Sequence, residues 1–396
     1  MNTEAINTAG AKHLVLLGAG PAHVHLLARL AKRPLPGTRV TLVSPKSHLF
    51  DVALVPRFVA GLGTLQDCVV PLEPLMQQAQ VRWVRRNAID LDPQARAVLM
   101  DDGSELPFDW LSIDNEPVLP RDRIQLTMPG ARENAMFVRP MEAFCNLWPR
   151  VPGLDQGGAI RVTLICDGIE AGQDFGMELA MAMRHRLPNA AVTLITGGAP
   201  LAASQPLAVQ ACWAEALRAR RITVLPDQAT GIARGEVLLG CGARLACDVP
   251  VVAASGQLPA WLGRCGLALD ALGAIAVDAC QRSTNHLHVF AAGPGYAAAV
   301  QLAASLVATA AGLEPKPHRD GLPRLKMLSC GDGKAIAAWG QHAAQGRLLG
   351  WLKYSVDRIR SAKYRLQAPA PNIPLPQQAA VCAKEDPHEP RYTSPP

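Results

Sequence analysis

One short stretch near the N-terminus limits the folds open to this chain more than any other. Residues 13–31 read HLVLLGAGPAHVHLLARLA, an apolar β-prone run followed by a Gly-Ala-Gly turn and a helical pattern. Pro21 follows the turn at a first-turn helix position, where its missing N–H removes no hydrogen bond. Dinucleotide sites use this arrangement because glycines let the backbone approach a diphosphate while helix N–H groups point at it. The stretch therefore predicts a strand–turn–helix unit suited to a dinucleotide.

The motif is nevertheless incomplete. Its G-x-G-x-x-G pattern ends at His23, where the third glycine is expected. Short Gly-x-Gly turns also occur in strand–helix units that bind nothing. Both interpretations stay open at this point, and His23 and His25 are compatible with packing as well as with chemistry.

The opening pattern recurs about one domain length later. Residues 161–166 (RVTLIC) form an apolar run, glycines follow at 168, 172 and 176, and a helical pattern runs from Met177 to Arg186. Residues 191–195 (AVTLI) repeat the next strand. Two such units predict an α/β fold with two Rossmann-like dinucleotide-binding domains and a C-terminal helical segment.

Composition excludes several function classes. A chain of 396 residues with 49% hydrophobic content can bury more than one core. The net charge of +6 is modest, and no dense Lys/Arg stripe with aromatics indicates nucleic-acid binding. The ten cysteines form no C-x-x-C pair and no zinc-ligand spacing, which predicts reduced thiols in a cytoplasmic protein without a metal site. The N-terminus lacks a signal-peptide layout, and the uncharged run 289–313 is predicted to be a buried helix.

Several ordered segments resemble a known group of enzymes. They are LVLLGAGPAHVHLL, VTLVSP, VPRFVAG, FDWLSID, GMELAMAMRHRL, VVAASGQLPAWL, the string from Gly266 to Gly293, and LSCGDGKAIAAWG. Between about His13 and Leu366 the chain resembles the two-dinucleotide-domain flavoprotein reductases, particularly type II NADH dehydrogenase-like proteins and the oxidoreductase module fused to selenide, water dikinase.

This resemblance implies FAD in the first module, reduced nicotinamide in the second, and hydride transfer between two stacked rings. It also implies a division into domains. The expected parts are an FAD-type domain of residues 1–118 and 285–330, an inserted NAD(P)H-type domain of 119–284, a C-terminal segment of 331–366 and a disordered proline-rich tail of 367–396.

The resemblance further implies individual site residues. Those expected to hold FAD are Gly18, Gly20, Pro21, Ala22 and His23 at the diphosphate, Ser44 and Pro45 at the adenosine ribose, and Gly293 and Pro294 toward the flavin. Glu178 corresponds to the acid that lies near the flavin and relays charge or protons in type II dehydrogenases.

The chain departs from the family pattern at four points. Pro294 replaces an Asp that hydrogen-bonds the ribityl chain, and the loop and helix after it look shortened. Residues 115–117 (NEP) replace a glycine-bearing turn. The second glycine turn carries Asp167, Glu170 and Asp174, and three carboxylates near a helix N-terminus would repel a diphosphate. Loss of nicotinamide binding, flavin binding or both therefore stays open.

The last helical pattern, residues 347–366, has Leu349, Leu352, Val356 and Ile359 along one face and six basic residues against one acid. Two placements are open: on an anionic membrane surface at the inner face of the cell membrane, as in peripheral quinone reductases, or on the protein's own core.

Three functions therefore compete. The first is an FAD-dependent oxidoreductase that takes hydride from NAD(P)H and passes electrons to a quinone or other small acceptor. The second is a degenerate flavoprotein fold that binds or regulates without turnover. The third is a flavoprotein with a donor other than nicotinamide.

Overall fold

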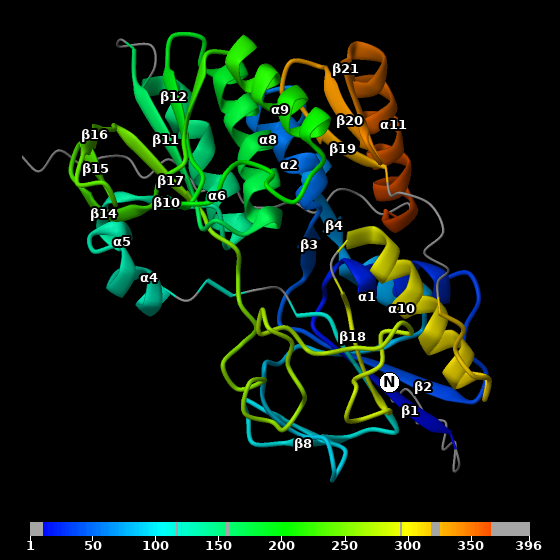
Figure 1. Cartoon of the computed structure of the whole chain (residues 1–396). Helices are drawn as coiled ribbons and strands as arrows, with labels where there is room; N and C mark the ends of the chain where they lie inside the picture. Colours follow the sequence, from blue (N-terminus) through cyan, green and yellow to red (C-terminus); the bar gives the residue numbers. More distant parts are fainter. Residues whose placement is uncertain are drawn as a thin grey trace, which may run out of the picture.

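The computed structural model describes residues 11–115, 118–119, 121–154, 159–293, 295–317 and 325–365 (Figure 1). Pro294, Glu116, Pro117 and the tail 367–396 lie outside these residues.

A parallel sheet of five strands organises the first module. Its order is β18-β9-β1-β2-β5. The strands are β1 (Lys12–Leu17), β2 (Thr38–Val43), β5 (Arg82–Val84), β9 (Trp110–Ile113) and β18 (Val289–Ala291). The last strand comes from far along the chain, so the second module is inserted between β9 and β18.

The second module repeats this sheet strand for strand, in the order β10-β17-β11-β12-β13. Its strands are β10 (Met136–Phe137), β11 (Arg161–Cys166), β12 (Ala191–Ile195), β13 (Ile222–Leu225) and β17 (Val249–Ala253). Two parallel sheets of the same order make this a doubly wound α/β fold.

Both sheets are covered on both faces, which explains why their central strands are almost wholly apolar. Along β1, Leu14 and Leu16 pack on one side with α1 (Pro21–Leu30), α3 (Leu72–Gln78) and α10 (Gly295–Ala310). Val15 and Leu17 pack on the other side with residues of β6 (Ala88–Asp92), β7 (Ala97–Met100) and β8 (Glu105–Pro107).

The second sheet is layered in the same way. One face carries α6 (Met141–Leu147), η3 (Trp148–Arg150), α7 (Val151–Leu154), α8 (Glu170–Arg186) and α9 (Leu207–Ala219). The other carries α4 (Arg121–Thr127), α5 (Ala131–Asn134) and the small sheet β14 (Ala229–Ala233), β15 (Glu236–Leu239) and β16 (Arg244–Ala246).

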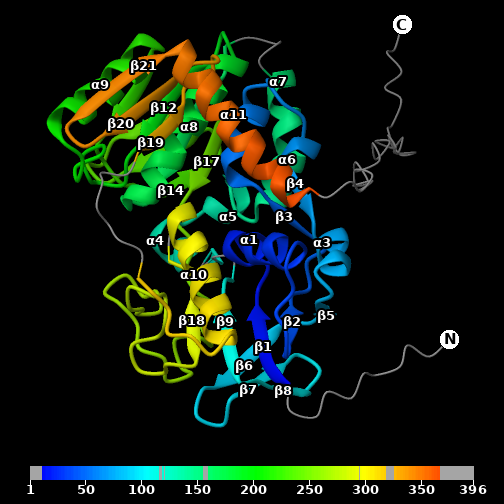
Figure 2. The same ribbon diagram turned by 90° about the vertical axis from the view of Figure 1, so that its right-hand side faces the viewer.

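The C-terminal part forms an antiparallel sheet and a helix that lie against the second module. Its elements are β19 (Lys326–Ser329), β20 (Ala335–Trp339), β21 (His342–Gly346) and α11 (Arg347–Tyr364). Figure 2 shows this sheet between α9 and α11, with α8 behind it. The segment after β2 runs up to the same region through β3 (His48–Phe50), η1 (Val52–Leu54), α2 (Val55–Val59), η2 (Gln66–Cys68) and β4 (Val69–Pro71).

Local patterns predicted most strands and helices, but the structure differs from them in two places. Helix α8 begins at Glu170, not at Met177, so Gly172 and Gly176 lie inside the helix and not in the turn. The region before the C-terminal helix also contains three strands, β19 to β21, for which the sequence analysis made no prediction. The nine cysteines among the described residues are all free thiols, and most are buried.

Candidate functional site

The turn after β1 has the shape that its glycines predict. Gly18 has a φ of +89°, which only glycine adopts without strain. Its N–H donates to Val43 of β2 at 2.9 Å, so the turn is tied to the neighbouring strand. Helix α1 then begins at Pro21 with Gly20 as its N-cap, and Gly20 makes no side-chain cap. The first N–H groups of the helix therefore need partners from elsewhere in the chain.

Asp114 supplies these partners. Its carboxylate Oδ2 accepts hydrogen bonds from the N–H groups of Ala22 at 2.7 Å and His23 at 3.0 Å. Its backbone carbonyl accepts from the Gly20 N–H at 2.9 Å. A Cβ on Gly20 would overlap the same carboxylate, and a Cβ on Gly18 would overlap Asn115. The space that the two glycines create is thus filled by the end of β9.

The His23 side chain contacts both the turn and the neighbouring strand β9. Its ring is fully buried, with Nδ1 at 2.6 Å from the Gly18 carbonyl and Nε2 at 2.8 Å from the Ser112 hydroxyl. Burial lowers the pKa of this imidazole, so the ring is neutral. A neutral ring fits the contacts: Nδ1–H donates to the carbonyl and Nε2 accepts from the hydroxyl. The histidine in place of the third glycine therefore joins the turn to β9, and its ring packs inside the fold.

The remaining residues expected at FAD lie at the same edge of the sheet. The Ser44 hydroxyl is buried and accepts from the Lys46 N–H at 3.3 Å, while Pro45 is exposed. The Gly293 N–H donates to the Gln281 side chain at 2.7 Å. Pro294 lies outside the described residues. Gln281, whose backbone has a φ of +65°, was not among the residues expected at the site.

The second turn also contains a carboxylate, but it is bonded differently. Asp167 Oδ2 accepts from the Ser255 N–H after β17 at 2.5 Å, and Oδ1 accepts from the Ile169 N–H at 3.2 Å. Asp174 points elsewhere: it pairs with Lys326 of β19 at 2.6 Å. The expected group of three carboxylates at this turn therefore has to be corrected, because helical spacing carries Asp174 to the face that packs on β19.

Glu178 lies in a buried charged network between α8, β19 and α11. Its Oε1 accepts from the Ser329 N–H at 2.6 Å and lies 3.6 Å from Lys353 Nζ. Lys353 donates to Asp357 at 2.9 Å, one turn along α11. Burial raises the pKa of Glu178, with Lys353 opposing the shift. Burial would lower the pKa of Lys353, but Glu178 and Asp357 hold it above its ordinary value. Lys353 was not singled out from the sequence, although its i,i+4 spacing to Asp357 is typical of an ion pair on one face of a helix.

A cavity of about 250 Å³ opens beside this network. Leu54, Leu62, Trp351 and Tyr354 give it apolar and aromatic walls, and Lys353 and Asp357 are also among its lining residues. It can accept a flat, partly apolar molecule with a polar group turned toward the charged network.

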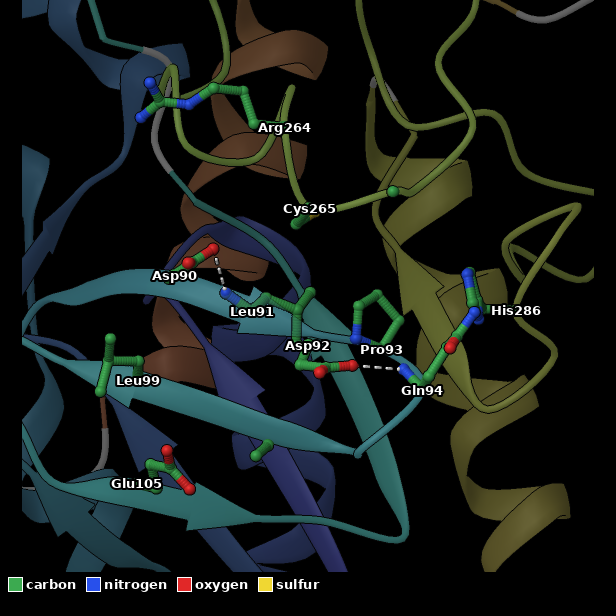
Figure 3. A pocket seen from close by; sticks show the side chains of 12 residues that line it. Asp90, Leu91, Asp92, Pro93, Gln94, Leu99, Glu105, Arg264, Cys265 and His286 are labelled. Carbon is green, nitrogen blue, oxygen red and sulfur yellow. Dashed lines mark hydrogen bonds between the residues drawn. The ribbon is translucent and has the colours of Figure 1, made fainter.

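A larger cavity of about 420 Å³ lies elsewhere, between the β6–β8 sheet and the loop carrying Arg264 and His286 (Figure 3). Two of its carboxylates accept hydrogen bonds from their own segment: Asp90 from the Leu91 N–H and Asp92 from the Gln94 N–H. It contains none of the residues expected at a cofactor.

Comparison with solved structures identifies the architecture. The sulfide:quinone oxidoreductase of Aquifex aeolicus superposes with a TM-score of 0.74 over 90% of this chain and 92% of that one, at 18% identity. NDH2 of Plasmodium falciparum, solved with NADH, superposes with a TM-score of 0.67 over 89% of this chain and 97% of that one, at 11% identity. The fold is that of the two-domain flavoprotein oxidoreductases.

Curated sequences point to the same group of flavoprotein oxidoreductases over shorter stretches. The sulfide-quinone reductase of Aquifex aeolicus is 28% identical over 109 residues, which are 28% of this chain and 25% of that protein. The mitochondrial external NADH-ubiquinone oxidoreductase 2 of Saccharomyces cerevisiae is 26% identical over 155 residues, 37% of this chain and 27% of that protein. The alignments span about a quarter of each relative. No family model matches the chain.

In a flavoprotein of this fold, the diphosphate of FAD lies against the first turn of the first Rossmann helix. Here the Ala22 and His23 N–H groups already bind the Asp114 carboxylate. The described residues therefore fit a diphosphate only when Asp114 has left the start of α1.

Proposed function

We propose that this chain is an FAD-dependent oxidoreductase that passes electrons to a quinone or other small acceptor, with reduced nicotinamide as the expected donor. The observation that carries the proposal is the cavity lined by Trp351 and Tyr354 together with Lys353 and Asp357, because it combines aromatic walls with a buried base and a buried acid. Such walls suit a quinone ring, and the Lys353 ammonium suits delivery of a proton to a reduced ring oxygen. Lys353 also pairs with Glu178, a carboxyl whose pKa burial raises and which can supply the next proton. The named relatives, a sulfide-quinone reductase and an NADH-ubiquinone oxidoreductase, support the same acceptor class.

The placement of α11 supports access to an acceptor dissolved in a membrane. The helix packs on the protein through its polar side, since its buried residues are Lys353, Asp357, Ser361 and Tyr364. The large apolar residues on its other side are exposed: Leu348, Trp351, Leu352, Val356 and Ile359.

The basic side chains of α11 fit the same placement. At about 100° per residue, the exposed Arg347 and Arg358 border one edge of this apolar stripe, and the exposed Lys363 lies on the same face one turn beyond Ile359. An apolar stripe with basic side chains along one edge and at one end suits the surface of an anionic bilayer. No helix among the described residues is long and apolar enough to cross a membrane. We therefore propose peripheral contact through residues 347–365 at the inner face of the cell membrane.

The visible absorption spectrum of the purified protein tests the main proposal. A flavin band that bleaches with NADH and recovers with a soluble quinone is the expected result. A flavin band that does not change when NADH is added would indicate an electron donor other than NADH. A colourless protein that cannot be reconstituted with FAD would favour the second candidate, a binding or regulatory protein without turnover. The carboxylate at the start of α1 is the observation that favours that candidate.

Flotation with vesicles of anionic phospholipid tests the membrane contact. We expect the native chain to float with the vesicles and the double variant Leu348→Glu/Trp351→Glu to stay behind. Leu272→Glu is the matched control, because Leu272 is at least as exposed but lies in a loop that packs on the first module. Equal flotation of all three proteins would contradict the placement.

A further inference from the structure

The carboxylate of Asp114 lies at the N-terminus of α1, where an anion is favoured. Two N–H groups of α1 donate to the carboxylate, and the Gly20 N–H donates to the backbone carbonyl of the same residue. The Asp114 N–H in turn donates to Leu17 at 2.9 Å, which continues the pairing of β9 with β1. The residue thus belongs to the sheet and caps the helix at the same time.

The helix dipole gives this contact its strength. The first N–H groups of a helix have no partners inside the helix and carry a partial positive charge. A carboxylate that accepts two of them makes charge-assisted hydrogen bonds, which are stronger than those between neutral groups. The same N–H groups and the same dipole hold a dinucleotide diphosphate. One group or the other can use them, but not both.

The surroundings keep the carboxylate in place. His23 bonds the Gly18 carbonyl on one side and the Ser112 hydroxyl on the other, so the turn and the end of β9 cannot separate easily. The missing side chains of Gly18 and Gly20 leave just enough space for Asn115 and Asp114. A ligand must therefore move the carboxylate out against contacts that the rest of the module maintains.

We propose that Asp114 is an internal competitor of the cofactor diphosphate and sets the affinity of the first module for FAD. The residue acts as a specificity determinant: it stabilises the empty module and weakens dinucleotide binding. This inference rests on the proposed use of FAD. It predicts that shortening Asp114 makes the protein less stable when empty and better at binding FAD, two effects of opposite sign from one side chain.

FAD titration of the apoprotein, followed by quenching of flavin fluorescence, tests the inference in three variants. Asp114→Ala removes the competitor, and we expect it to bind FAD about tenfold more tightly than the native chain. Asp114→Asn removes the charge but keeps an acceptor, so we expect its affinity for FAD to lie between those of the native chain and Asp114→Ala. If Asp114→Ala does not fold, the asparagine variant still tests the inference. Asp109→Asn is the matched control, because Asp109 accepts from the His13 N–H at the other end of β1. Its affinity should equal that of the native chain.

A second readout separates competition from a general loosening of the fold. Without FAD, Asp114→Ala should melt at a lower temperature than the native chain, and saturating FAD should raise its melting temperature by more. Equal FAD affinity in all proteins, or weaker binding by Asp114→Ala, overturns the inference and leaves the proposed function standing. Failure of every variant to bind FAD overturns both.

Discussion

The two modules have the same strand order, yet they use a carboxylate at the turn in different ways. In the first, the carboxylate comes from the neighbouring strand β9 and binds the N–H groups at the start of α1. In the second, Asp167 follows β11 itself, and its main partner is the Ser255 N–H after the neighbouring strand β17. The first carboxylate stabilises a helix, whereas the second holds two strand ends together.

This difference shows that the same scaffold can hold a carboxylate at the turn in two ways. Asp114 accepts from the N–H groups at the start of α1, the kind of donor that holds a diphosphate in Rossmann folds generally. Asp167 takes the N–H groups of Ser255 and Ile169 instead. Its charge lies beside the first turn of α8, since a Cβ on Gly172 would come within 2.9 Å of its Oδ1. A carboxylate can therefore oppose an anion in two ways: Asp114 occupies the N–H donors at the start of α1, whereas Asp167 only places a negative charge near the start of α8.

The largest effect is expected from Gly20→Ala. The new Cβ would overlap the Asp114 carboxylate and push it off the helix, so both the cap and the turn are lost. We expect the free energy of unfolding in urea to fall by about 3 kcal/mol. Gly263→Ala is the control, because its Cβ would meet only the Ala260 carbonyl at 3.5 Å. If the two variants are equally stable, Asp114 is not held as the structure shows.

Gly176→Ala tests the second module at the place where α8 approaches β11. Its Cβ would overlap the buried Cys166 sulfur, so we expect a loss of about 2 kcal/mol in the same urea experiment. Removing the sulfur in the double variant Cys166→Ala/Gly176→Ala should restore part of the loss. A double variant as unstable as the sum of the single changes would contradict the close approach.

The pH dependence of stability tests the locked turn of the first module. Burial holds the pKa of His23 below its ordinary 6.5, so the unfolded chain takes up a proton at a higher pH than the folded chain does. Stability should therefore fall as the pH drops below about 6.5, by at most about 1.4 kcal/mol per pH unit for this one proton. Burial also lowers the pKa values of His13, His25 and His288, so the native slope contains these residues as well.

His23→Gln isolates the contribution of one ring. Glutamine keeps a donor and an acceptor but does not titrate. Thermal unfolding between pH 7.5 and 5.5 should show a smaller loss of stability for this variant than for the native chain. An unchanged slope would mean that the imidazole is not buried in the neutral form.

The smallest effect is expected from Asp167→Asn. The amide oxygen can still accept from the Ser255 N–H, and no N–H from inside α8 donates to Asp167 in the hydrogen bonds described, so the change should stay within about 1 kcal/mol. Asp114→Asn should cost more, because its carboxylate accepts two N–H groups from the first turn of α1. Thermal unfolding of the two variants side by side checks this order, and the reverse order would contradict the distinction between the two crevices.

Local patterns were reliable where a segment's own side chains determine its conformation. Strands β11 and β12 have the bounds that their apolar runs predicted. The strands of the C-terminal sheet were missed because Ala-rich segments such as β20 have little β-propensity of their own and depend on their partners. The early start of α8 was missed because its glycines suggested a turn, although Gly176 serves close packing on Cys166.

The sequence by itself determined the repeated strand–glycine–helix units, and with them the doubly wound fold, because apolar periodicity and glycine placement are local properties. It also identified Gly18, Gly20 and Glu178 as residues of interest. Only the tertiary structure decided what these residues touch. Asp114 meets α1, and Lys353 meets Glu178, through contacts between segments far apart in the chain. Such contacts depend on how sheets and helices pack together, and no local pattern contains that information.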